Sequence, residues 1–123
     1  MIAVLFEAWP NEGQEDVYFD MAARLRPDLD GVDGFISIER FRSVSDAGKI
    51  LSLSWWRDEE ALTVWRNLKS HRTTQAAGRR HVFRDYRLRV GGIDRDYGMF
   101  DRDHAPVDSQ TLHGCSASAL TAL

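Results

Sequence analysis

Apolar residues in the first ninety positions follow a strand, helix, strand, strand, helix, strand pattern. The expected strands cover residues 2–9, 35–42, 49–56 and 85–90. One helix follows Pro10, and the other follows Asp58, a good capping residue with two glutamates behind it in the first turn. Two β-α-β units in series predict an α+β fold, the ferredoxin-like β-α-β-β-α-β sandwich. Its strand order is 4-1-3-2, antiparallel, with both helices on one face.

Both predicted helices have the apolar spacing of amphipathic helices. We expect Asn11 to cap the first one and Pro27 to end or kink it. The second has an apolar stripe that includes Trp65 and Leu68, and we expect it to continue until Gly78 interrupts it.

The two faces of the predicted sheet differ in chemistry. The face under the helices is expected to carry apolar side chains: Val4, Phe6, Ile36, Ile38, Leu51, Leu53, Trp55, Tyr86, Leu88 and Val90. The helix-free face is then expected to mix aromatic, aliphatic and polar or charged side chains: Leu5, Glu7, Trp9, Phe35, Ser37, Glu39, Phe41, Ile50, Trp56, Arg87 and Arg89. Such a face is too aromatic for open water and too charged for a single-chain core. A homodimer joined through the helix-free sheet face satisfies both, with its glutamates available to pair with its arginines.

Composition narrows the class of protein. With 43% hydrophobic and 28% charged residues, the chain is an ordinary globular protein. A net charge of -3 gives no general reason to expect binding to nucleic acid or to an acidic membrane. No apolar run approaches the ~20 residues that span a bilayer. The lone Cys115 excludes an internal disulfide, and we expect a cytoplasmic location.

The chain is expected to form one domain over residues 1–100, followed by a C-terminal extension over residues 101–123. The extension is set apart because residues 109–123 lack charge and are rich in Ser, Ala, Thr and Gly. It is expected either to dock on the dimer or to be flexible.

The region from Trp65 to Gly98 combines a helix-borne aromatic, a titratable imidazole and several guanidinium groups. Trp65 suits either the wall of a cavity or plain core packing. His71 suits either a general base or a surface histidine, because it lies about 120° around a continuous helix from Trp65. Arg79 suits either a partner for an anionic substrate or a complement to the helix dipole. The other histidines lack metal-ligand spacing, so no metal site is expected.

The architecture and a set of residues resemble the antibiotic biosynthesis monooxygenase-like family of dimeric ferredoxin-like proteins, the dimeric α/β-barrel type. The matching residues are Trp65, His71, Gln75, Gly78, Arg79, Phe83, Tyr86, Val90 and the run from Arg95 to Gly98. The resemblance covers residues 1 to about 100. It implies either cofactor-free oxidation of phenols to quinones, haem degradation or an unassigned activity, because fold alone does not choose among them.

The haem-degrading branch of this family implies an Asn on the first strand and a haem-ligating His well beyond a Trp on the second helix. Here the first strand has Glu7 as its only polar side chain, and His71 follows Trp65 by six residues. Gln75 stands where that branch implies the histidine. This disfavours haem degradation. The phenol-oxidising branch implies less, namely a general base and a nearby cation.

The function that these observations favour is a cofactor-independent monooxygenase that oxidises a small, electron-rich, phenolic aromatic with O2. His71 is the expected base and Arg79 its electrostatic partner. Trp65, Phe83 and Phe6 are expected to bind the substrate, without a cofactor or metal. The alternative is a non-catalytic dimeric module that binds a small molecule or only a partner protein. The two differ in whether His71 faces a closed cavity beside Trp65 or faces water.

Overall fold

The computed structural model describes residues 1–77 and 81–114 and divides the chain into two compact units, Met1–Gly92 and Ile93–Leu123. The sequence boundary was expected near residue 100. Each unit is described by itself below. Within the described ranges no helix is both long and apolar enough to cross a membrane.

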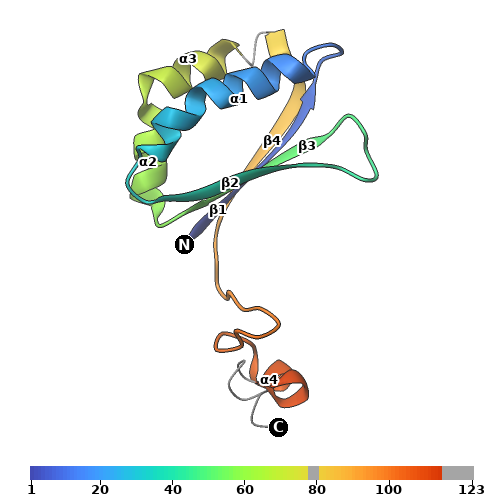
Figure 1. Cartoon of the computed structure of the whole chain (residues 1–123), viewed down its shortest axis with the longest axis vertical. Coiled ribbons are helices and arrows are strands. Elements are labelled where there is room, and N and C mark those ends of the chain that lie inside the picture. Colours follow the sequence, from blue (N-terminus) through green and yellow to red (C-terminus); the bar gives the residue numbers. More distant parts are fainter. Residues whose placement is uncertain (78–80, 115–123) are drawn as a thin grey trace. The chain divides into compact units, whose positions relative to one another are not determined.

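The first unit is a four-stranded sheet with helices packed on one face (Figure 1). Its elements are β1 (Ile2–Pro10), α1 (Glu15–Asp30), β2 (Phe35–Arg42), β3 (Ile50–Trp56), α2 (Glu59–Asn67), α3 (Lys69–Ala77) and β4 (Phe83–Gly92). The strands are antiparallel in the order β2-β3-β1-β4, which is the predicted order read from the other edge. The prediction of an α+β, ferredoxin-like fold is therefore confirmed.

The predicted inward residues of β1 and β4 are confirmed, but those of β3 are wrong by one position. Phe6 lies opposite Ser52 and Leu88, so Ser52 shares its helix-covered face. Ile50 and Trp56 are 1% exposed under the helices, whereas the leucines of β3 lie on the helix-free face. The register with β1, rather than the hydrophobicity of β3, decides which face each residue takes, because apolar residues occupy both faces.

A register shift in β2 explains a second difference from the sequence prediction. The pairing with β3 shifts between Phe35 and Ser37. Ile36 is 53% exposed as a result, although it was expected to be under the helices. Phe35 instead packs on Trp56 in the core, with ring centroids 5.3 Å apart, so its expected place on the helix-free face is also wrong.

The core under the helices consists of two hydrophobic clusters. One is centred on Trp56 and includes Val4 and Leu62, with Trp65 packed against it. The other is centred on Tyr18, Ile50 and Val82, with Phe6 and Phe83 packed against it. Between them the floor of the sheet is built from serines, since Ser52 and Ser54 are each 6% exposed. Small side chains at the middle of β3 leave space that leucines would have filled.

The predicted second helix is two helices. Leu68 adopts an extended conformation (φ -64°, ψ 137°) that ends α2, and its N–H donates to the carbonyl of Trp65. The expected interruption at Gly78 lies outside the described residues. Helix α1 also differs from expectation, because it begins after Gln14 rather than at Asn11 and continues through Pro27 to Asp30.

The helix-free face of the sheet carries charged groups that pair within the chain. Glu7 forms ion pairs with Lys49 and with Arg89. The Lys49 ammonium lies 5.4 Å from the centre of the Trp9 ring, and the Trp9 indole donates a 3.0 Å hydrogen bond to Asp46. The expected pairing of Glu7 with an arginine of β4 therefore occurs within a single chain.

The second unit is organised around one buried arginine. Arg102 is 6% exposed and donates hydrogen bonds to the carbonyl oxygens of Gly98 (3.1 Å) and Gly114 (3.2 Å). Its guanidinium lies 5.1 Å from the centre of the Tyr97 ring. Helix α4 (Val107–His113) forms part of this unit, so a short helix lies within the expected extension, after its non-helical first residues, 101–106.

Candidate functional site

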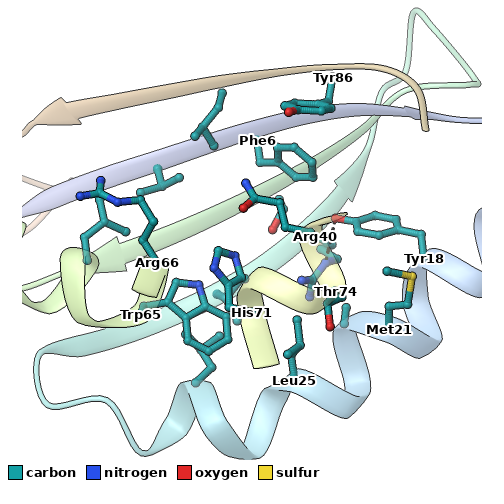
Figure 2. A pocket seen from close by; sticks show the side chains of 18 of the residues that line it. Phe6, Tyr18, Met21, Leu25, Arg40, Trp65, Arg66, His71, Thr74 and Tyr86 are labelled. Atoms are coloured by element: carbon teal, nitrogen blue, oxygen red, sulfur yellow. Dashed lines mark hydrogen bonds between the residues drawn. The ribbon is translucent and has the colours of Figure 1, made fainter. Parts of the chain in front are cut away.

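A cavity of about 260 Å³ lies between the two hydrophobic clusters, bounded by the sheet and by α1, α2 and α3 (Figure 2). Its walls include four residues expected from the sequence to form the site: Phe6, Trp65, His71 and Phe83. Arg79, the fifth, lies outside the described residues. The volume is near the lower end of that of typical small-molecule sites, ~300 Å³. A compact aromatic molecule is therefore the size of ligand to consider.

The break at Leu68 brings His71 to the cavity. On a continuous helix the imidazole would lie about 120° around the axis from Trp65. In the structure the two rings lie with centroids 4.6 Å apart and a 33° angle between their planes. Figure 2 shows them side by side on the cavity wall. His71 therefore lines a cavity beside Trp65, which is the position expected for a base, although the cavity is smaller than the closed pocket of ~300 Å³ expected for an enzyme.

The imidazole of His71 has a buried nitrogen without a partner. Its Nδ1 is out of contact with solvent and makes no hydrogen bond. Burial lowers the pKa of His71 below its ordinary value of 6.5, and the nearby Arg72 acts in the same direction. A hydrogen bond with the backbone of Arg66 opposes these two effects on the pKa. The imidazole is therefore neutral near pH 7. Because solvent does not reach Nδ1, this unpaired nitrogen becomes an acceptor for a ligand only when the ring turns toward the cavity.

Arg40 is a cavity residue that the sequence analysis missed. It lies on β2 opposite Ser52, and its Nε donates a 3.2 Å hydrogen bond to the hydroxyl of Tyr18. The guanidinium also lies 5.6 Å from the centre of the Tyr18 ring. The available signal was the alternation of β2 after Ile38, which places residue 40 on the inward face.

Arg66 adds a second guanidinium to the lining, at a more exposed position. Its terminal nitrogen lies 3.5 Å from the hydroxyl of Thr63. Neither cavity arginine has a carboxylate within ion-pair distance in the described part of the chain. The lining includes no aspartate or glutamate, and so this part of the molecule is locally positive.

Aromatic side chains close the cavity around Tyr18. Phe6 contacts Phe83 and Tyr86, with ring centroids 5.6 Å and 5.5 Å apart. Phe83 also contacts Tyr18 at 5.3 Å. These edge-on and tilted contacts are typical of well-packed aromatic clusters. Phe6 and Phe83 therefore have a structural role in addition to their position on the cavity wall.

The described residues offer no metal site, since no group of three or more His, Cys, Asp or Glu side chains within them could hold an ion. What they do offer is an apolar space with one neutral imidazole, two guanidinium groups and the hydroxyls of Tyr18 and Thr74. That set can bind an aromatic ring, accept a proton from it and stabilise negative charge on it.

Comparison with known proteins agrees with this architecture. Residues 1–77 match the family model described as antibiotic biosynthesis monooxygenase. The jasmonate monooxygenase ABM of Pyricularia oryzae is 48% identical over 93 residues, which are 76% of this chain and 43% of that protein. This chain therefore spans less than half the length of that relative.

Two further relatives are more distant. The uncharacterized protein YqjZ of Bacillus subtilis is 27% identical over 93 residues, which are 76% of this chain and 79% of that protein. The structure of Rv0793 from Mycobacterium tuberculosis superimposes with a TM-score of 0.69 at 15% identity, over 79% of this chain and 98% of that one. At this identity the structural likeness shows a shared fold.

Proposed function

Because this chain belongs to the antibiotic biosynthesis monooxygenase family, we propose that it is a cofactor-independent monooxygenase that oxidises a small, electron-rich phenol with O2. The observation that carries the proposal is the imidazole of His71, which lines a largely apolar cavity against Trp65 and has an unpartnered Nδ1. Perturbed titratable groups in cavities are typical of catalytic sites.

In the proposed reaction the His71 ring turns toward the cavity and its Nδ1 accepts the phenolic proton. The resulting phenolate is a far better electron donor than the phenol and reacts with O2 directly. One oxygen atom becomes a new ring carbonyl, and the other leaves as water with two hydrogens of the substrate. The phenol becomes a quinone, and all four electrons taken up by O2 come from the substrate. The balance therefore needs no external reductant.

The proton transfer needs help from the cavity. A phenol titrates near ~10 and an imidazole near ~6.5, a gap of ~3.5 units or ~5 kcal/mol. Burial of His71 lowers its pKa and widens the gap. The guanidinium group of Arg66, the cavity cation on the His71 side, stabilises a phenolate there and so narrows the pKa gap. Arg79, the partner expected from the sequence, keeps this role as a prediction.

The test is oxygen uptake with a panel of dihydroxy-aromatic compounds. We expect His71→Ala to lower the rate by ~100-fold or more, as for loss of a general base. Trp65→Phe should mainly weaken binding, because it trims the wall and leaves the base in place. His81→Ala is the matched control, since His81 is exposed and does not line the cavity. Equal rates and pH profiles in wild type and His71→Ala would show that histidine is not the base.

The panel also includes a jasmonate, because the Pyricularia relative is named for that substrate. Oxidation of the jasmonate without oxidation of any phenol would overturn the phenolic substrate and keep the monooxygenase. A second candidate function, a non-catalytic binding module, rests on the largely apolar cavity wall. It predicts ligand-induced thermal stabilisation without oxygen uptake.

We also propose a homodimer joined through the helix-free face, and a cytoplasmic location. The face carries Leu5, Leu51, Leu53 and Trp55, and Phe41 is 42% exposed. Apolar area of this kind is typical of a contact surface between subunits. The lone Cys115 fits a reducing compartment.

A further inference from the structure

The cavity is positive inside a chain that is negative as a whole. The sequence has 19 acidic and 16 basic residues, for a net charge of -3. Even so, among the described residues the cavity lining includes Arg40 and Arg66 and no carboxylate. Arg66 is exposed and keeps its hydration, but Arg40 is half-buried, and a half-buried cation against apolar walls is favourable only when an anion or strong hydrogen-bond acceptors compensate its lost hydration. The charge that is missing from the wall is therefore expected on the ligand.

Two nearby arginines of β2, Arg40 and Arg42, differ in whether a carboxylate neutralises them. Arg40 and Arg42 point to the same side of the strand. Arg42 forms an ion pair with Glu15 at the start of α1. Arg40 instead contacts Tyr18, three residues after Glu15 on α1, and donates a hydrogen bond to its hydroxyl. A hydroxyl positions the guanidinium without neutralising it.

The hydrogen bond to Tyr18 uses only the Nε of Arg40. Within the described residues, the two terminal nitrogens of this guanidinium make no hydrogen bond or ion pair. A guanidinium with one edge fixed and its other donors free is suited to a carboxylate, which it binds through two parallel hydrogen bonds. Tyr18 itself is 6% exposed, so the fixed edge is held by a well-packed residue.

We propose that the ligand of this cavity is a small aromatic carboxylic acid whose carboxylate binds Arg40. Figure 2 shows Arg40 and Tyr18 together on the side of the cavity away from Trp65. An acid held there extends its ring toward Trp65 and His71. Arg40 is thus a specificity-determining residue that distinguishes acids from neutral analogues. The identity of the oxidised end rests on the proposed function, whereas the preference for an anion is a binding property that can be measured without turnover.

The probes are 4-hydroxyphenylacetate and 4-hydroxyphenylacetamide, which share the phenol and differ in the charge of the other end. Titration calorimetry at pH 7 is expected to show that the wild type binds the acid about ten- to hundredfold more tightly than the amide, as for a charge-assisted pair. Arg40→Met should reduce this ratio to within about twofold, while Arg40→Lys should keep part of it. Arg24→Met is the matched control, because Arg24 is exposed on α1 and does not line the cavity.

Three results would overturn the proposal: no binding of the acid at millimolar concentration, equal affinity for both probes, or an unchanged ratio in Arg40→Met. If Arg40→Met does not fold by circular dichroism, Arg40→Lys and Tyr18→Phe replace it, and a ratio equal to that of the wild type in both overturns the idea. Oxygen uptake from neutral phenols that is insensitive to Arg40 would leave the monooxygenase standing without the anion site. Preference for the acid without oxygen uptake from any phenol would keep the anion site and remove the monooxygenase.

Discussion

On the helix-free face of the sheet, Glu7 pairs with Lys49 and with Arg89, whereas in the cavity over the helix-covered face Arg40 of β2 and Arg66 of α2 have no carboxylate partner among the described residues. Both faces use the same four strands, and both are largely apolar between their charged groups. On the helix-free face the charged side chains form ion pairs with one another. The remaining apolar area of that face is available for contact with a protein surface. The cavity instead leaves its cations open, so its charge balance depends on a ligand.

The pKa values on the two faces differ in cause. Hydrogen bonding by Lys49 lowers the pKa of Glu7, and the charges of Lys49 and Arg89 add to this. On the covered face burial lowers the pKa of His71, against a hydrogen bond with the Arg66 backbone. The carboxylate of Glu7 is kept ionised by its cationic partners, whereas the imidazole of His71 is kept neutral by burial. Only the second is prepared to take up a proton during a reaction.

The largest effect is expected from filling the cavity. Ser52→Leu places a bulky side chain on its floor, where Ser52 is 6% exposed. We expect at least ~100-fold loss of kcat/KM with an unchanged or higher Tm, because the new side chain occupies space that is empty of protein. Activity and thermal unfolding measured on the same sample check this. If Ser52→Leu retains full activity, the covered face is a core rather than a site.

The next effect concerns the other face of the same strand. Leu53 is the neighbour of Ser52 and points to the helix-free face. Leu53→Asp should raise the dissociation constant of the proposed dimer at least ~10-fold, since it buries a charge at the contact. Light scattering after size exclusion should show twice 14.1 kDa for the wild type and a shift toward the single mass for the variant.

Val64→Asp is the control for that experiment, because Val64 is 51% exposed on α2 and lies away from the proposed contact. It should keep the mass of the wild type. A wild type that remains monomeric at low micromolar concentration would remove the dimer and with it the explanation offered for the helix-free face.

The smallest effect is on the pH dependence of stability. The folded pKa of His71 lies below its unfolded value of 6.5, so the unfolded state binds the proton more readily. Stability should therefore decrease as pH falls below about 6.5, and the decrease should level off below the folded pKa. His71→Phe should lack this decrease. Glu7 acts in a lower window, because its contribution is lost as pH falls below its ordinary value of 4.5.

Denaturant unfolding at a series of pH values checks both windows. The decrease near pH 6.5 should be present in the wild type and absent in His71→Phe, and the decrease below pH 4.5 should be present in both. A wild type and a His71→Phe variant with parallel curves between pH 5 and 7 would contradict the burial of a neutral imidazole.

The order of the strands followed from the sequence because each strand and helix has its own periodicity, which is a local property. Which residues of β3 face the helices did not follow, because large apolar residues stand on both sides of this strand, Ile50 and Trp56 under the helices and the two leucines on the helix-free face. Which side is covered depends on pairing with β1, a contact distant in sequence. Arg40 was missed for a related reason, since a charge on the inward side of β2 is unusual unless a ligand or partner meets it.

The position of His71 depends on the helix break at Leu68, and no residue type in the sequence predicts this break. Leu68 is a good helix former, and neither glycine nor proline is present between Asp58 and Ala77. The identities of His71 and Trp65 as candidate site residues came from the resemblance and from their chemistry. Their contact came only from tertiary structure, which turns α3 away from the axis of α2.

The break at Leu68 also has a consequence for local stability. Helices α2 and α3 have 9 residues each, shorter than the ~12–15 residues at which an isolated helix becomes marginally stable. The helical state of α3 therefore depends on what packs against it, and a ligand in the cavity is part of that packing. Ligand binding and folding of α3 are thermodynamically linked, so a tight ligand must slow amide hydrogen exchange along residues 71–77. The segment that carries the base would then be most ordered when its substrate is present.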